Sequence, residues 1–233
     1  MKRKESLSAP RHTQVYGVIT ADLVESRRLT NRALVQKRLL RLIHSLNSEF
    51  RRGLVGPFMV TLGDEIQGML KDLSDLPNAV IRIHDVFHSR EITVGVGIGN
   101  IATPIAKRVS EMDGPAFVNS RIAVELAKKE GLEVVVRSGI GRVDDTLNAV
   151  YGLLGGIQAG WTDAQLERFN LYRQLGTIDK VARKLKVSKQ SISKSLRNTL
   201  WYRILDVEER LPSTFGELQS DAQWIRPGVG SGG

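Results

Sequence analysis

Segment 91–99 alternates between two kinds of residue so regularly that a β-strand is the structure it predicts. One face carries branched apolar side chains, and the other carries Thr93, Gly95, Gly97 and Gly99. A glycine-lined face lets a helix or a ligand come close to the strand backbone. The glycine spacing does not fit a dinucleotide-binding loop, because the third glycine comes one residue early and no helix follows directly. We therefore expect a closely covered strand and no dinucleotide site.

The remaining patterns predict strands and helices in a definite order. Residues 15–21 form an almost unbroken apolar run, which is typical of a strand buried on both faces. Apolar residues from Val35 to Phe50 recur with helical spacing. A hairpin over 58–70, helices near 77–87 and 116–129, and a strand over 132–136 complete the series. The order β-α-β-β-α-β-α-β predicts an α+β fold, a ferredoxin-like or palm sheet with helices on one face.

Composition changes after residue 150. Segment 151–160 is rich in glycine, as expected of a joint between domains, and the following residues have a helical pattern. We therefore predict five parts: a basic N-terminal arm at 1–14, a palm domain at 15–150, a linker at 151–160, an all-α helix-turn-helix domain at 161–210 and a tail at 211–233.

The chain is basic, with a formal net charge of +9 from 34 Lys and Arg against 25 Asp and Glu. Such a charge is typical of proteins that meet nucleic acid. The absence of cysteine excludes disulfides and cysteine-based metal or redox sites. No apolar run reaches the length of a membrane span, and the N-terminus lacks the apolar segment of a secretory signal. We expect a cytoplasmic protein that does not bind membranes.

Two acidic positions suggest a site in the palm. Asp22 follows the first strand directly, and Asp64 and Glu65 occupy the turn of the 58–70 hairpin, 64 − 22 = 42 residues later. In a palm topology the strand end and the hairpin tip are neighbours in space. Carboxylates that meet there hold Mg²⁺ or Mn²⁺, which in turn grips the phosphates of a nucleotide. A solvated hairpin without a ligand is the alternative.

Three motifs resemble those of class III nucleotide cyclases. Segment 20–26 resembles their first metal motif, 62–65 resembles their second and the GGDEF signature of diguanylate cyclases, and 114–119 resembles the segment that supplies a transition-state asparagine. Residues 15 to about 137 are similar to the SatD family, a bacterial group with the same outline. The resemblance implies metal ligation by Asp22, Asp64 and Glu65. It also implies nucleotide contacts by Leu23, Ser26, Arg27, Asp113, Asn119 and Arg121.

Two departures weaken the cyclase function that this resemblance implies. Glu25 replaces a glycine whose backbone approaches the triphosphate, and its carboxylate would repel the phosphates. Ala123 stands where cyclases place an arginine, and it cannot stabilise charge on a transferring phosphoryl group. A palm that binds a nucleotide without catalysis is therefore favoured over a working cyclase.

Segment 176–197 resembles a bacterial helix-turn-helix, and its residue types support this independently. Thr177 and Ser188 are suited to cap two short helices, and Val187 to fill the turn between them. Ile192, Leu196 and Leu200 form the expected buried face of the second helix. Its polar residues suit base edges near its start and phosphates farther along. The predicted DNA-binding residues are Thr177, Lys186, Ser188, Lys189, Gln190, Ser191, Ser193, Lys194 and Arg197.

The leading hypothesis is a homodimeric transcription regulator that binds double-stranded DNA and responds to a nucleotide or cyclic-nucleotide effector. The first alternative is an enzyme, a metal-dependent nucleotidyl cyclase or phosphotransferase that uses Asp22 and Asp64. A second alternative is an architectural DNA-binding dimer with an empty palm. For the basic helices, a dimerisation or RNA-binding module is also open.

Overall fold

The computed structural model describes residues 14–24, 32–87, 91–197 and 199–221. Its sheet has the strand order β2-β3-β1-β4-β5. Strand β1 pairs antiparallel with β3 and with β4, β2 pairs antiparallel with β3, and β4 pairs parallel with β5. The strands are β1 (Tyr16–Leu23), β2 (Leu54–Leu62), β3 (Glu65–Leu70), β4 (Ile92–Gly99) and β5 (Val134–Arg137).

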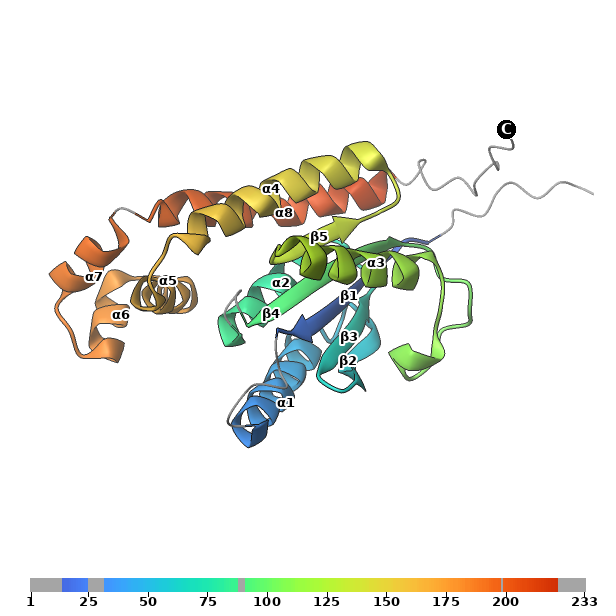
Figure 1. Cartoon of the computed structure of the whole chain (residues 1–233), viewed down its shortest axis with the longest axis horizontal. Helices are drawn as coiled ribbons and strands as arrows, with labels where there is room; N and C mark the ends of the chain where they lie inside the picture. The colour runs from blue at the N-terminus through green and yellow to red at the C-terminus, as the bar shows by residue number, and fades with distance from the viewer. Residues whose placement is uncertain (1–13, 25–31, 88–90, 198, 222–233) are drawn as a thin grey trace, which may run out of the picture.

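Helices alternate with these strands in the predicted order, and β1 to β4 with α1 and α2 form the ferredoxin-like arrangement (Figure 1). The α+β fold class is thereby confirmed. A short 3-10 helix, η2 (Val109–Glu111), precedes α3. The helices are α1 (Arg32–Glu49), α2 (Asp75–Val86), α3 (Pro115–Glu130), α4 (Gly141–Ala159), α5 (Asp163–Leu175), α6 (Ile178–Leu185), α7 (Lys189–Leu196) and α8 (Trp201–Ser220).

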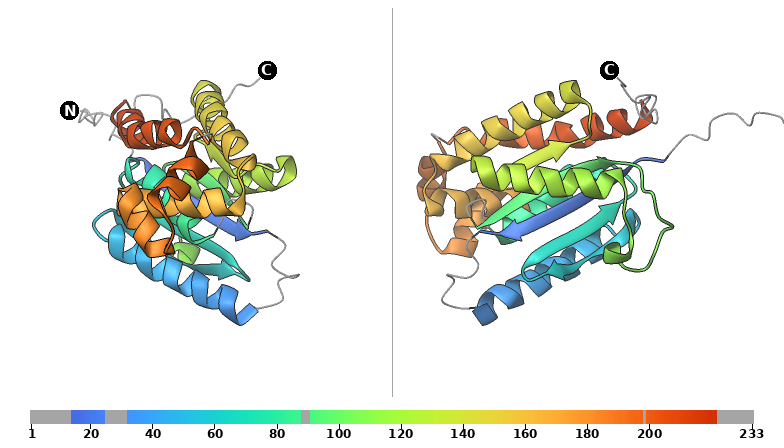
Figure 2. Two further views of the ribbon diagram at one scale, coloured as in Figure 1. Left: turned by 90° about the vertical axis from the view of Figure 1, so that its left-hand side faces the viewer. Right: turned by 45° about the vertical axis from the view of Figure 1, so that its right-hand side comes forward.

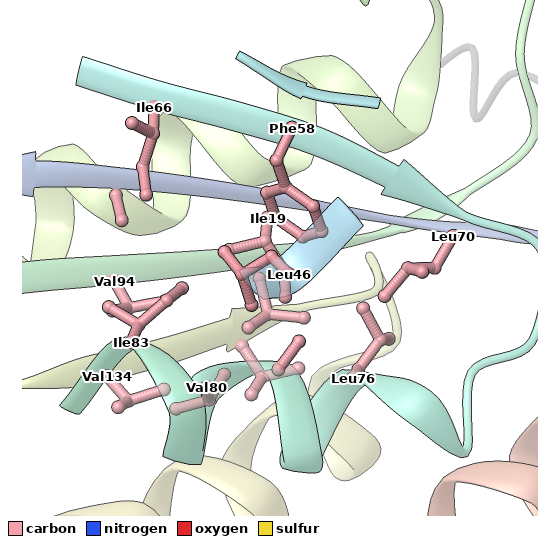
Figure 3. Packing of buried hydrophobic residues seen from close by; sticks show 14 of the residues in the cluster. Ile19, Leu46, Phe58, Ile66, Leu70, Leu76, Val80, Ile83, Val94 and Val134 are labelled. Carbon is pink, nitrogen blue, oxygen red and sulfur yellow. The ribbon is translucent and has the colours of Figure 1, made fainter. Parts of the chain in front are cut away.

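One face of the sheet carries the main apolar core (Figure 3). Ile19 of β1, Ile66 of β3 and Val94 of β4 pack there against Leu46 of α1 and Ile83 of α2, and all five are fully buried. Alternation in each strand sends every second side chain to this face. The same core receives residues of α4 and α8.

Helix α3 covers the opposite face, so the expectation of helices on one face only is wrong. The reason is the glycine face of β4. A Cβ on Gly95 would lie 2.3 Å from the backbone nitrogen of Val124, and one on Gly97 would lie 2.1 Å from that of Ser120. The close partner that the glycines admit is therefore the α3 backbone itself.

A second apolar core lies among α5, α6 and α7. Helices α4 and α8 run from the palm towards it and contribute to both cores (Figures 1 and 2). In α4, Leu147 belongs to the palm core and Ile157 packs against the second core. In α8, Ile204 belongs to the second core and Phe215 to the palm core.

These two helices differ from the predicted division of the chain. Residues 151–159 of the expected linker lie within α4, and residues 211–220 of the expected tail lie within α8. The glycines of α4 do not end the helix, because its apolar residues pack on both cores. The expected arm at 1–14 lies outside the described residues except for Gln14. None of the described helices is long and apolar enough to cross a membrane.

Candidate functional site

Strand register places two of the predicted acids together. Ala21 of β1 stands opposite Ile66 of β3, so the next step along both strands brings Asp22 level with Glu65. Thr20 accepts a hydrogen bond from Gln67 Nε2 at 3.0 Å, and its hydroxyl lies 3.0 Å from that of Ser120 on α3, so these side chains share the α3 face. Because side chains alternate, Asp22 and Glu65 point to that face as well. The carboxylates therefore meet at one edge of the sheet, on the side of α3.

Asp22 forms an ion pair with a lysine of the same chain. Its Oδ2 lies 2.9 Å from Nζ of Lys128 on α3, and the same ammonium lies 3.1 Å from Glu125 Oε1. Burial lowers the pKa of Lys128, but hydrogen bonds to Asp22 and Glu125 and their charges outweigh it, so the pKa is raised. Lys128 is therefore a permanent positive charge beside the predicted metal ligand. No local pattern in the sequence indicates this pair, because the two residues are far apart in the chain.

The hairpin turn follows the predicted chemistry. Gly63 has a φ of +62°, a conformation that glycine adopts without a Cβ penalty. Glu65 Oε1 accepts a hydrogen bond from Thr61 Oγ1 at 2.7 Å, which holds the carboxylate against β2. Asp64 Oδ2 is buried without a hydrogen-bond partner among the described residues. An unpaired buried carboxylate oxygen is costly, and among the three predicted metal ligands Asp64 has such an oxygen within the described part of the chain.

The predicted metal ligands are not part of a larger cluster of acids and histidines among the described residues. Within the part of the chain that the structure describes, no three His, Asp or Glu side chains are grouped so as to hold a metal ion. Lys128 also neutralises Asp22 in place of a divalent cation. Glu25 lies outside the described residues. A divalent cation at Asp22 would therefore compete with Lys128, and metal binding by Asp22, Asp64 and Glu65 stays a prediction.

The residues expected to contact a nucleotide are spread over several places. Leu23 is buried in the palm core, on the face away from Asp22. Asn119 donates a hydrogen bond from Nδ2 to the Ile98 carbonyl at 2.9 Å, and Asp113 Oδ1 accepts one from the Gly114 N–H at 2.7 Å. Arg121 is exposed on α3. Ser26 and Arg27 lie outside the described residues.

Helices α6 and α7 have the caps that the sequence indicates. Thr177 Oγ1 accepts a hydrogen bond from the Lys180 N–H at 3.3 Å, and Ser188 Oγ accepts one from the Ser191 N–H at 3.1 Å. Each cap satisfies a backbone donor that has no partner inside its helix. Lys186 ends α6 in the left-handed region, with a φ of 56°. The three-residue turn 186–188 then directs α7 across α6.

The buried face of α7 is shorter than predicted. Ile192 and Leu196 are buried in the second core with Phe169 and Val181. Leu200, however, is 46% exposed and lies beyond α7, which ends at Leu196. Its left-handed φ of 53° breaks the helical spacing on which the expectation depended. The expectation that Leu200 is hidden is therefore wrong.

The polar face of α7 is open to solvent. Lys189, Gln190, Lys194 and Arg197 are exposed, as are Lys186 and Ser188 in the turn and Thr177 before α6, whereas Ser191 and Ser193 are partly buried. The Lys189 ammonium forms an exposed ion pair with Asp179, at 2.6 Å from Oδ2. The predicted DNA-binding residues thus form a surface, which we call the α7 face: Lys186, Lys189, Gln190, Lys194 and Arg197.

Comparisons with known proteins add the following. No curated protein matches the chain. A structure of a bacterial light-regulated adenylyl cyclase is similar with a TM-score of 0.40 and 12% identity, over 64% of this chain and 81% of that one. A second structure of a bacterial light-regulated adenylyl cyclase has a TM-score of 0.39 and 11% identity, over 52% of this chain and 42% of that one. Residues 16–204 match the SatD family. The match spans both the palm and the helix-turn-helix, and the chain belongs to the SatD family.

Proposed function

We propose that this protein is a DNA-binding regulator in which the α7 face contacts double-stranded DNA and the palm binds a nucleotide or cyclic-nucleotide effector. The observation that carries the DNA-binding half is the division of α7 into two faces. Ile192 and Leu196 anchor it in the second core, while Gln190, Lys194 and Arg197 are exposed. A helix fixed in this way can enter the major groove without losing its fold.

The residue types on the α7 face suit both kinds of DNA contact. Gln190, near the N-terminus of α7, has the amide geometry that pairs with adenine. Lys194 and Arg197, farther along, suit phosphates or guanine. The exposed pair between Lys189 and Asp179 is worth less than about 1 kcal/mol, so a phosphate can replace the aspartate.

DNA binding is tested by fluorescence anisotropy with a library of random duplexes at several salt concentrations. We expect binding that weakens steeply with salt, because phosphate contacts release counterions. The double variant Lys194→Ala/Arg197→Ala should weaken binding, whereas Lys129→Ala, an exposed lysine on α3, should not. Absence of salt-sensitive binding by the intact protein would refute the DNA-binding half.

The effector half is supported by Asp22 and Glu65 on the α3 face, and above all by the unpaired oxygen of Asp64 in the turn before Glu65. Calorimetric titration with a panel of nucleotides and cyclic nucleotides, with and without Mg²⁺, tests it. Binding that is lost in Asp64→Ala supports the proposal. If the protein binds no nucleotide of the panel, the effector half fails and an architectural DNA-binding protein is the remaining interpretation.

The same oxygen of Asp64 favours a second candidate function, a metal-dependent cyclase or phosphotransferase. Its test is incubation with each nucleoside triphosphate and Mg²⁺ or Mn²⁺, with Asp64→Ala as the control. We also propose a homodimer, since helix-turn-helix proteins commonly bind pseudo-palindromes as dimers. Sedimentation equilibrium with and without DNA measures this.

A further inference from the structure

Arg173 connects the helix-turn-helix part to the palm through two carboxylates. It lies on α5, with Nη1 2.9 Å from Asp85 Oδ1 on α2 and Nη2 3.1 Å from Glu208 Oε1 on α8. The three side chains are only 12%, 5% and 12% exposed, respectively. The guanidinium also lies 4.6 Å from the centre of the Phe169 ring. Arg173 is therefore fixed from three sides at the junction of the two cores.

The charges continue into the palm. Arg82 on α2 lies 3.3 Å from Asp85 Oδ2 and 2.8 Å from Glu49 Oε2 on α1. A row of alternating charges thus runs from α1 through α2 to α5 and α8. Because the pairs near Arg173 are shielded from solvent, losing one partner leaves a buried charge unpaired and costs far more than losing an exposed pair.

Beside Arg173 lies a small pocket between α2, α4, α5 and α8, lined by both apolar and polar side chains. Its volume is about 40 Å³, which is room for about three water molecules and too little for a nucleotide. Four of its polar atoms are buried with no hydrogen-bond partner among the described residues: His84 Nε2, Tyr151 Oη, Arg173 Nε and Glu208 Oε2. The contact between the two parts of the protein thus includes buried polar groups here, unlike the apolar cores on either side.

The part of helix α4 that passes along this pocket is the part that its residue types stabilise least as a helix. Gly152, Gly155 and Gly156 lie within one turn and a half of the helix, and Gly155 lines the pocket. Glycine destabilises a helix interior relative to alanine, because its backbone loses more conformational freedom on folding. Packing does not require glycine at 152 or 156, because a Cβ at either position would meet no atom within 4 Å. The segment of α4 that bridges the two cores is therefore easy to bend.

We propose that the junction is a hinge with a lock: α4 bends at Gly152–Gly156, and Arg173, held by Asp85 and Glu208, fixes the angle between the helix-turn-helix and the palm. The consequence for DNA rests on the proposed function: opening the lock changes how the α7 face is presented. In a dimer, a small change of angle at each hinge alters the spacing of two α7 helices, which must match half-sites about one helical turn apart.

The test measures the angle without using DNA. The chain contains no cysteine, so spin labels attach only at introduced ones. Lys184→Cys on α6 and Arg41→Cys on α1 are both exposed and lie on opposite sides of the junction. Pulsed electron paramagnetic resonance then gives the distribution of distances between them. We expect one narrow distribution in the otherwise unchanged protein.

Three variants separate the lock from the hinge. Asp85→Asn/Arg173→Met/Glu208→Gln removes the three charges together, which avoids leaving a buried ion unpaired, and it should broaden the distribution or add a second distance. Gly152→Ala/Gly156→Ala, added to that variant, should restore the narrow distribution. Arg210→Met, which removes an exposed arginine paired with Asp206 on α8, should change nothing.

The outcomes distinguish this inference from the proposed function. A distribution that stays narrow in the triple variant, or that is already broad in the starting protein, overturns the lock. A broad distribution that the alanines fail to narrow overturns the hinge at α4. If the distances change as expected and no variant binds DNA, the hinge stands and the DNA-binding proposal fails. Circular dichroism of each variant confirms that both parts are folded.

Discussion

The ammonium of Lys128 lies 2.9 Å from a carboxylate oxygen of Asp22, so the residue expected to hold a metal is already paired within the chain. A divalent cation that binds Asp22 would have to compete with this ammonium. Substitution of Lys128 is therefore the most direct experiment on the acids of the palm.

Removing Lys128 should strengthen the binding of a divalent cation. Lys128→Ala takes away a positive charge next to Asp22, and we expect the dissociation constant of Mn²⁺ to fall by about tenfold, or about 1.4 kcal/mol. Titration calorimetry with Mn²⁺ measures this. Lys129→Ala, the exposed neighbour on α3, is the matched control. Equal affinity in the two variants would show that Lys128 does not compete with a cation.

The close approach of α3 to β4 predicts a large loss of stability in Gly97→Ala. The new Cβ would lie 2.1 Å from the backbone nitrogen of Ser120, and a backbone atom cannot rotate away. We expect the free energy of unfolding to fall by about 3 kcal/mol or more, at the upper end for overpacking. Urea denaturation measures it, and Gly141→Ala, where a Cβ meets nothing within 4 Å, is the control. A loss below that of the control variant would mean that α3 is loosely packed.

The cap of α7 is a separate determinant of the helix-turn-helix. Ser188→Ala removes the acceptor of the Ser191 N–H and should lower stability by about 1 kcal/mol. Ser188→Asp keeps an acceptor at the same position and should restore most of the loss. Thermal unfolding followed by circular dichroism compares the three proteins. Equal melting temperatures in the alanine and aspartate variants would exclude a capping role.

Local patterns in the sequence were sufficient for most of the fold. Alternation predicted β4, the turn at Gly63-Asp64 predicted the hairpin, and Thr177 and Ser188 predicted the starts of two helices. Each of these features depends on residues only a few positions apart. The glycine face of β4 indicated a close partner but not that the partner is α3. The glycines near 152 predicted a linker. The segment is helical instead because α4 packs on two cores, and most residues of those cores lie elsewhere in the chain.

The contacts that define the candidate sites could not be predicted in this way. Asp22 and Lys128 are 128 − 22 = 106 residues apart, and no spacing rule connects a strand end to the last turn of a distant helix. The ion pairs of Arg173 could not be predicted either, since its partners Asp85 and Glu208 lie on helices before and after it in the chain. No local pattern in the sequence indicates the environment of His84 and Asp85 either. Their role depends on burial, which tertiary packing decides.

Two buried groups beside Arg173 give opposite dependences of stability on pH. Burial raises the pKa of Glu208 from its ordinary value of 4.5 to about 7, because the effect of the Arg173 charge is smaller and Asp85 adds to the rise. Burial and the Arg173 charge lower the pKa of His84 from 6.5 to about 4. Glu208 therefore contributes stability below pH 4.5 that is lost as pH rises through about 7. His84 contributes stability above pH 6.5 that is lost as pH falls through about 4.

Between pH 4.5 and 6.5 the two effects oppose each other, at about 1.4 kcal/mol per pH unit each, so we expect these two groups to leave stability nearly constant there. Glu208→Gln removes one of them and should make the protein less stable on acidification. His84→Asn should make it less stable as pH rises. Urea denaturation of the three proteins at intervals across this window measures the slopes. Parallel plots of the free energy of unfolding against pH for the two variants would contradict this. They would show that neither Glu208 nor His84 changes its protonation on unfolding in the way that burial at the junction requires.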